Sequence, residues 1–172
     1  MMRSLHQRLH REARTYSGDD DRPLASYAGL MGVYATATAG VAAAARATGR
    51  ALPDPTPWDV TLTALATHQL SRLIAKDPVT SPLRAPFTRF EGTTGPAELA
   101  EDVRGTGARK AVGELVTCPF CTGLWVATAC TAGSIFAPRA TRLVTATLAA
   151  LAAADFLQFA RTAAQHVADD AS

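Results

Sequence analysis

The chain has 172 residues, enough for one domain of ordinary size. Its 17 Lys and Arg nearly balance its 15 Asp and Glu, which argues against a nucleic-acid-binding protein with a strongly basic surface. Apolar residues make up 48% of the chain but aromatic residues only 6%, so a large soluble core is hard to build. The 3 cysteines are too few for a secreted disulfide scaffold.

Residues 1–22 form a basic N-terminal tail with five arginines and no apolar stretch, which is unlike a cleavable signal peptide. From Met1 to Tyr16, apolar residues recur at helical spacing and arginines occupy the other faces. This pattern fits an amphipathic helix on an anionic membrane surface, and a solvated, frayed tail fits it as well.

Four apolar segments follow the tail. Residues 23–45 and 115–138 are uncharged, and each run exceeds the ~20 residues that cross a hydrocarbon core of ~30 Å. Residues 60–71 are also uncharged, and residues 143–160 contain one charge, Asp155. The sequence therefore predicts an all-α fold, a four-helix transmembrane bundle over residues 23–165. Its helices are expected at about 24–46, 57–76, 118–137 and 141–163, before a short acidic tail at 166–172.

The second predicted helix has clear end signals. Thr56 is suited to the N-cap, Pro57 to the first helical position and Asp59 to the first turn, while Pro78 stops the helix near Lys76. The Pro- and Gly-rich loop at 77–116 then connects the second and third helices. Within it we expect extended or irregular chain, with a short helix over Glu98–Arg104.

Basic residues divide unevenly between the two sides of such a bundle. The tail holds five, the stretch Arg72–Lys110 holds seven, and Arg161 brings one side to thirteen; the opposite turns hold four. The positive-inside rule then predicts a multi-pass protein of the cell (inner) membrane with both termini and the long loop in the cytoplasm. The alternative is a soluble Ala-rich four-helix bundle, which explains the two long uncharged runs less well.

Cys118 and Cys121 form a C-P-F-C motif at the start of the third helix. A thiolate near a helix N-terminus is stabilised by free N–H groups, so a redox-active pair is one interpretation. A metal site is another, but structural zinc needs four ligands and Cys130 is too far along the helix. Two small packing thiols are the third. We therefore predict no metal site and no cofactor.

The predicted topology brings ionisable residues to the depth of this motif. His68 and Arg72 of the second helix and Asp155 of the fourth are expected near Cys118 and Cys121. Charges inside a membrane are costly and are usually paired or functional. We predict that Asp155 pairs with Arg72 first, or with His68; a purely structural ion pair is an equally simple interpretation of this candidate cluster.

Two segments, Ser71–Gly92 and Gly113–Trp125, together resemble a bacterial domain-of-unknown-function family of small integral membrane proteins. The resemblance covers about Tyr27 to Ala160, and some members of the family are labelled sporulation proteins of the YjcA kind. It implies a helical membrane protein and no particular activity. The sporulation label belongs to some members only and is not transferred.

The leading functional hypothesis is a non-catalytic protein that acts through its cytoplasmic loop. The candidate interaction residues are Lys76, Asp77, Arg84, Pro86 and Phe87, which combine charge, a rigid bend and an aromatic anchor. Pro86 and Phe87 could equally just fold the loop back onto the bundle. The expected partners are the lipid bilayer and a protein, with no nucleic acid. The alternatives are a membrane thiol-redox or metal-handling protein using the C-P-F-C motif, and a soluble helical interaction domain.

Overall fold

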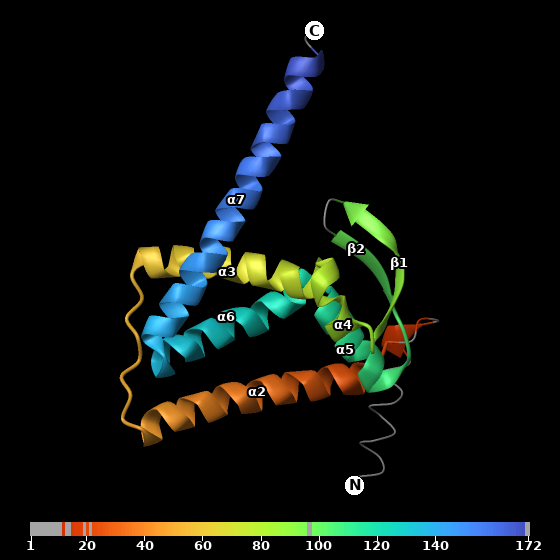
Figure 1. Cartoon of the computed structure of the whole chain (residues 1–172). Coiled ribbons are helices and arrows are strands. Elements are labelled where there is room, and N and C mark those ends of the chain that lie inside the picture. The colour runs from red at the N-terminus through yellow and green to blue at the C-terminus, as the bar shows by residue number, and fades with distance from the viewer. Residues whose placement is uncertain (1–11, 13–14, 19, 21, 96–97, 171–172) are drawn as a thin grey trace.

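The computed structural model describes residues 12, 15–18, 20, 22–95 and 98–170, and most of them are helical (Figure 1). The long helices are α2 (Leu24–Ala47), α3 (Pro57–Lys76), α6 (Pro119–Phe136) and α7 (Pro138–Asp170). Between α3 and α6 lie η1 (Pro78–Thr80), α4 (Ser81–Arg84), β1 (Thr88–Gly95), β2 (Glu98–Val103) and α5 (Gly107–Thr117).

The β1–β2 hairpin lies where α3 ends and α6 begins (Figure 1). We name this the hairpin end of the molecule. The far end holds the connection from α2 to α3 and the turn from α6 to α7. The last part of α7 projects away from the other helices, and α7 runs to Asp170, so the predicted acidic tail falls largely within this helix.

The hairpin corrects the all-α prediction and the expected helix over Glu98–Arg104. Glu98–Val103 is strand β2, which pairs antiparallel with β1 in the register Thr88↔Val103 and Arg89↔Asp102. The segment is rich in Glu, Leu and Ala, whose local preference is helical, so pairing with β1 overrides the local preference.

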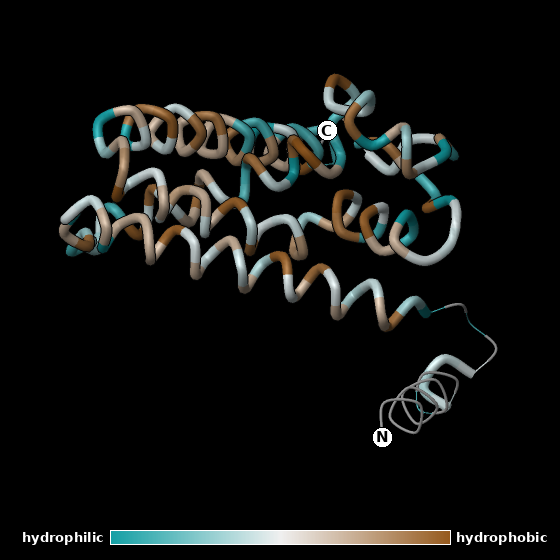
Figure 2. Tube along the Cα trace, turned by 90° about the horizontal axis from the view of Figure 1, so that it is seen from below, coloured by the Kyte–Doolittle hydropathy of each residue, from teal (hydrophilic) through white to brown (hydrophobic). Residues whose placement is uncertain are grey.

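Among the described residues, three helices are long and apolar enough to cross a membrane: α2, α6 and α7. The remaining predicted span, the second in chain order, is α3; it has 20 residues and is not one of these three helices, because it is more polar. In Figure 2, α2 is the tube that leads from the N-terminal part of the chain, and it is mostly pale to brown between its ends. The chain is thus a mostly helical protein with three candidate membrane helices.

The residues Thr56 and Asp59, predicted at the start of the second helix, cap α3. The Thr56 hydroxyl accepts a hydrogen bond from the Asp59 amide at 3.2 Å, and the Asp59 carboxylate accepts one from the Thr56 amide at 3.1 Å, a reciprocal capping box. Arg50 closes the far end of α6 by donating to the carbonyl oxygens of Ile135 and Phe136 at 3.3 and 3.1 Å. These contacts fix where the helices start and stop.

Helix α3 packs against both α6 and α7 through small side chains. The buried residues of these contacts include Ala66, Ala75, Ala149 and Ala152. A Cβ on Gly123 of α6 would lie 3.8 Å from the Thr67 methyl group of α3, an ordinary contact distance. Close approach through small residues is the packing expected of helices in a bilayer, where large apolar side chains gain little by leaving lipid.

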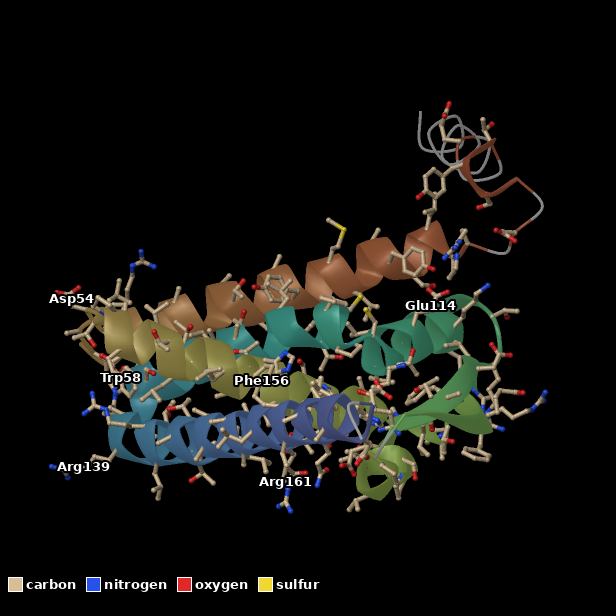
Figure 3. The ribbon with its side chains drawn as sticks, turned by 90° about the horizontal axis from the view of Figure 1, so that it is seen from above. Asp54, Trp58, Glu114, Arg139, Phe156 and Arg161 are labelled. Carbon is tan, nitrogen blue, oxygen red and sulfur yellow. The ribbon has the colours of Figure 1, made fainter. Side chains whose placement is uncertain are left out.

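Helix α2 attaches to the bundle at fewer points. The hydroxyl groups of Tyr34 and Thr128 share a hydrogen bond of 2.8 Å, and the Tyr34 ring meets Trp125 edge to face at 5.2 Å between centroids. At the hairpin end, the Tyr27 hydroxyl donates to the Glu114 carboxylate of α5. Figure 3 shows Glu114 at this end, and Asp54, Trp58 and Arg139 at the far end.

Candidate functional site

The C-terminal end of α3 is closed by a tight turn. The Asp77 carboxylate accepts a hydrogen bond from the Val79 amide at 2.7 Å, which starts η1. The Thr80 hydroxyl donates to the carbonyl oxygens of Leu73 and, at 3.0 Å, Asp77. Leu73 holds one of the last four carbonyl groups of α3, which have no helical partner, so the turn completes the helix end.

Arg84 is buried whole beneath this turn, with 0% of its surface exposed. Its guanidinium donates to the Ile74 carbonyl at 2.7 Å, the Thr80 hydroxyl at 2.7 Å, the Asp77 carbonyl at 3.0 Å and the Glu101 carboxylate. The Glu101 side chain is only 6% exposed. Because a buried charge is tolerated only when it is paired and hydrogen-bonded, this arrangement fixes α3, α4 and β2 relative to one another.

Helix α5 holds the hairpin from its other side. The Arg104 amide donates to the Phe87 carbonyl at 2.9 Å, and Arg109 Nε donates to the Pro86 carbonyl at 2.9 Å. A Cβ on Gly113 would lie 2.6 Å from Val103 Cγ1, so α5 and β2 meet at a distance that only glycine permits. We name residues 77–95 and 98–117 the hairpin unit, because these contacts make them one folded piece rather than a loose loop.

A second ion pair ties this unit to the bundle. Arg72 of α3 donates to the Glu98 carboxylate of β2. Their side chains are 32% and 29% exposed, so the pair is partly screened by solvent and is worth less than the Arg84–Glu101 pair.

The two cysteines of the C-P-F-C motif lie together at the start of α6. Cys118 is the N-cap, and its Sγ accepts a hydrogen bond from the Cys121 amide at 3.3 Å. Cys118 is half-buried and Cys121 is exposed. Both cysteines are free thiols.

The pKa of Cys118 is shifted by opposing effects. Burial raises it, whereas hydrogen bonds from the Cys121 side chain and from the Cys121 and Phe120 amides lower it, as does the positive charge of Lys76. The lowering effects prevail, so the pKa of the Cys118 thiol lies below its usual range. Cys118 is therefore the thiol of the pair with the greater thiolate character.

The predicted pair between Arg72 and Asp155 is wrong. Asp155 accepts a hydrogen bond from Gln69 Nε2 at 2.9 Å. Arg72, three residues further along α3, instead donates to the Glu98 carboxylate. His68 stacks on Phe156 with 5.9 Å between ring centroids. Residues 68–72 thus contact α7 on one side and the hairpin on the other, and Arg72 and Asp155 have different partners.

The predicted interaction residues separate into buried and accessible groups. Arg84 is inaccessible, so it supports the hairpin unit and cannot itself contact a partner. Asp77 serves as the cap of η1, Phe87 is half-buried, and Pro86 is exposed. The apolar side chains that the unit does expose are Val79 at 86%, Leu83 at 66% and Phe90 at 62%.

Sequence reasoning missed the acidic and amide partners. Gln69, Glu98 and Glu101 each pair with a residue that the sequence analysis singled out. No local signal identifies Glu101 as the partner of Arg84, because Asp77 and Glu91 lie closer to Arg84 in the sequence. Within the described residues, no group of three or more His, Cys, Asp and Glu side chains is placed to hold a metal ion.

Residues 62–161 match the family described as a protein of unknown function, DUF1360, and the chain belongs to this family. The chain is 37% identical over 71 residues to the protein named sporulation protein YjcA from Bacillus subtilis (strain 168). The aligned part is 40% of this chain and spans 60% of the relative's length. No solved structure matches the chain.

Proposed function

We propose that this member of the DUF1360 family is a four-span membrane protein without catalysis of its own, which presents the hairpin unit to a protein partner. The observation that supports this most is the burial of Arg84 with all three guanidinium nitrogens hydrogen-bonded, because a segment held this firmly is a preformed surface. A preformed surface loses little conformational entropy on binding.

The membrane topology, with four spans and a cytoplasmic hairpin end, is part of this proposal. Helix α3 is the fourth span: it has 20 residues, about 30 Å at 1.5 Å per residue, and it packs between α6 and α7. Its polar residues are sheltered by neighbours, as Gln69 is by Asp155 and His68 by Phe156. With four spans, the hairpin end and the C-terminus face the cytoplasm of the cell (inner) membrane, in agreement with the placement of the basic residues.

The proposed contact residues are the exposed large apolar side chains of the hairpin unit. Val79 and Leu83 lie four residues apart on successive turns of η1 and α4, and Phe90 projects from β1. Strand β1 has register shifts at Phe90/Gly92 and Thr93/Gly95, which interrupt its free edge. Such irregularities disfavour indiscriminate strand pairing, so side chains rather than the backbone edge make the proposed contact.

Photo-crosslinking in native membranes tests this function. A benzophenone amino acid at Phe90 or Leu83 is expected to give one adduct of the same mass, and the same probe at Leu52 at the far end is the control. The Arg84→Met change should abolish the adduct while the protein stays in the membrane fraction. An adduct that survives Arg84→Met, or that forms equally at Leu52, contradicts the proposal.

A second candidate function uses the thiols. The Cys118 Sγ contact with the Cys121 amide supports a reversible disulfide, in which both thiols lose a proton and two electrons pass to a partner disulfide. Alkylation before lysis distinguishes the two functions. The non-catalytic function predicts that both cysteines are labelled as free thiols and that the Cys118→Ser/Cys121→Ser variant keeps the adduct at Phe90. Cysteines that resist the reagent until reduced favour the redox function.

A further inference from the structure

A groove of about 1320 Å³ runs along the junction of α3, α6 and the start of α7. Small and hydroxyl side chains line it, including Thr67 and Ser71 of α3 and Gly123 and Ala127 of α6. Its lining on α3 includes both Val60 and Lys76, which are about 24 Å apart at 1.5 Å per residue. The groove is therefore long and follows α3, which we place in the membrane; Figure 3 labels Asp54, a lining residue at its far end.

Its two ends differ in charge. At the hairpin end the lining includes Arg72, Lys76 and Glu98, and Arg72 is paired with Glu98. No carboxylate of the described residues forms a salt bridge with Lys76, so this end has one positive charge in excess.

Among the residues that line the groove, the opposite charge balance holds at the far end. There Arg142 lies 3.6 Å from the Asp59 carboxylate, and Asp54 adds a second negative charge to the lining. An elongated ligand with one anionic end is thus oriented by the groove itself, with its anionic end beside Lys76.

We propose that this groove binds an anionic phospholipid, with an acyl chain along the floor between α3 and α6 and the phosphate beside Lys76. One leaflet of hydrocarbon is ~15 Å deep, so the 24 Å lining of α3 is long enough for a chain of that depth. A lysine near the membrane surface strengthens binding of an anionic lipid about fivefold. The inference rests on the membrane placement of α3 proposed above, and it is independent of the protein partner.

Native mass spectrometry of the full chain in detergent micelles tests the proposal. The micelles contain equal amounts of phosphatidylglycerol and phosphatidylcholine, and the ratio of the two in the first bound lipid is measured. The wild type should prefer phosphatidylglycerol about fivefold, and Lys76→Gln should bring the ratio close to one. Arg161→Gln, on the exposed part of α7 outside the groove, is the matched control and should keep the preference.

Two further arms separate the sources of binding. Ala127→Phe fills the floor of the groove and should weaken both lipids alike, while size-exclusion chromatography checks that the variant is folded. Millimolar sodium phosphate should not displace the lipid, because the acyl chain contributes most of the contact.

Several outcomes overturn the lipid site. These are a wild-type ratio near one, a preference that survives Lys76→Gln, displacement by phosphate, or a dimer that excludes lipid and thereby assigns the groove to a second copy. Labelling from both sides of the membrane, described at the end of the Discussion, tests the placement of α3 separately. A failed lipid experiment with correct labelling therefore rejects the groove proposal alone.

Discussion

The hairpin unit and the helix bundle are stabilised by different kinds of contact. The unit buries Arg84 with its carboxylate partner Glu101, whereas α3, α6 and α7 meet through alanines, one glycine and single hydrogen bonds such as Gln69–Asp155. Outside a membrane, burial of the unit's few apolar residues gives little stability, so a polar network fixes its shape. In the helix bundle, which we propose lies in the membrane, close backbone approach through small residues fixes the helices relative to one another with no buried ion pair like Arg84–Glu101 among its described contacts. The comparison predicts that single changes cost most in the unit and least in the bundle.

The largest effect is expected at Arg84. Arg84→Met leaves the Glu101 carboxylate buried without its partner and should lower the free energy of unfolding by about 3–5 kcal/mol. The change in free energy of unfolding is measured by chemical unfolding in detergent, with proteolysis of the hairpin unit as the readout. Arg89→Met at an exposed position of β1 is the control and should change it by less than about 0.5 kcal/mol. Equal effects of the two variants would remove the distinction on which the comparison rests.

Two glycines compare the regions directly. A Cβ at Gly113 meets Val103 Cγ1 at 2.6 Å and the Phe87 carbonyl at 3.2 Å, so Gly113→Ala should cost about 1–3 kcal/mol. A Cβ at Gly123 in the bundle meets atoms of Thr67 and Ser71 at 3.8 and 4.0 Å, which are ordinary contacts. Gly123→Ala should be neutral or slightly stabilising, since alanine favours the helix. Thermal unfolding of both variants in the same detergent measures the two changes in stability. A larger loss for Gly123→Ala than for Gly113→Ala would refute the packing of these glycines.

In the bundle, the Gln69–Asp155 contact has a moderate effect. Asp155→Ala leaves the Gln69 amide without this partner and should destabilise by about 1–3 kcal/mol. A double-mutant cycle with Gln69→Leu should be non-additive, whereas the cycle with Arg72→Ala should be additive, because Arg72 pairs with Glu98. Coupling between Asp155 and Arg72 instead would reinstate the ion pair expected from the sequence.

Among the contacts that variants remove, the smallest loss of stability is expected where α2 joins α6. Tyr34→Phe removes the hydrogen bond to Thr128 and keeps the ring contact with Trp125, so the loss should be about 0.5–1.5 kcal/mol. Tyr34→Ala loses the ring contact as well and should cost more. If Tyr34→Phe costs as much as Tyr34→Ala, the hydrogen bond rather than the ring attaches α2.

The thiols give a pH prediction rather than a stability one. Since the pKa of Cys118 lies below its usual range, its thiolate should persist to a lower pH, and iodoacetamide should alkylate it faster than a model thiol near neutral pH. In Cys121→Ala the hydrogen bond from the neighbouring side chain is gone, so the pH midpoint of alkylation should rise. Cys121→Ser, which keeps a donor, should leave it lower than in Cys121→Ala. An unchanged midpoint in both variants would rule out this cause.

The sequence was informative where local chemistry decides. Thr56 and Cys118 marked helix starts and are N-caps in the structure, Pro57 is the first residue of α3, and the uncharged runs correspond to α2 and α6. It was misleading where a partner distant in the chain decides. Glu98–Val103 has helical preference and becomes a strand only through pairing with β1, and the choice of Arg72 for Glu98 over Asp155 depends on where that strand lies. The burial of Arg84 could not be predicted for the same reason, because its partner Glu101 lies on that strand.

Side-specific labelling tests the central claim that four helices, α3 included, present the hairpin unit to the cytoplasm. In a background with Cys118, Cys121 and Cys130 replaced by serine, single cysteines are placed by Leu52→Cys, Phe90→Cys and His166→Cys, all at exposed positions. A membrane-impermeant maleimide on intact cells should label Leu52→Cys alone, and the other two only after the membrane is opened. Labelling of Leu52→Cys and Phe90→Cys from the same side would show that α3 does not cross, and would contradict the account.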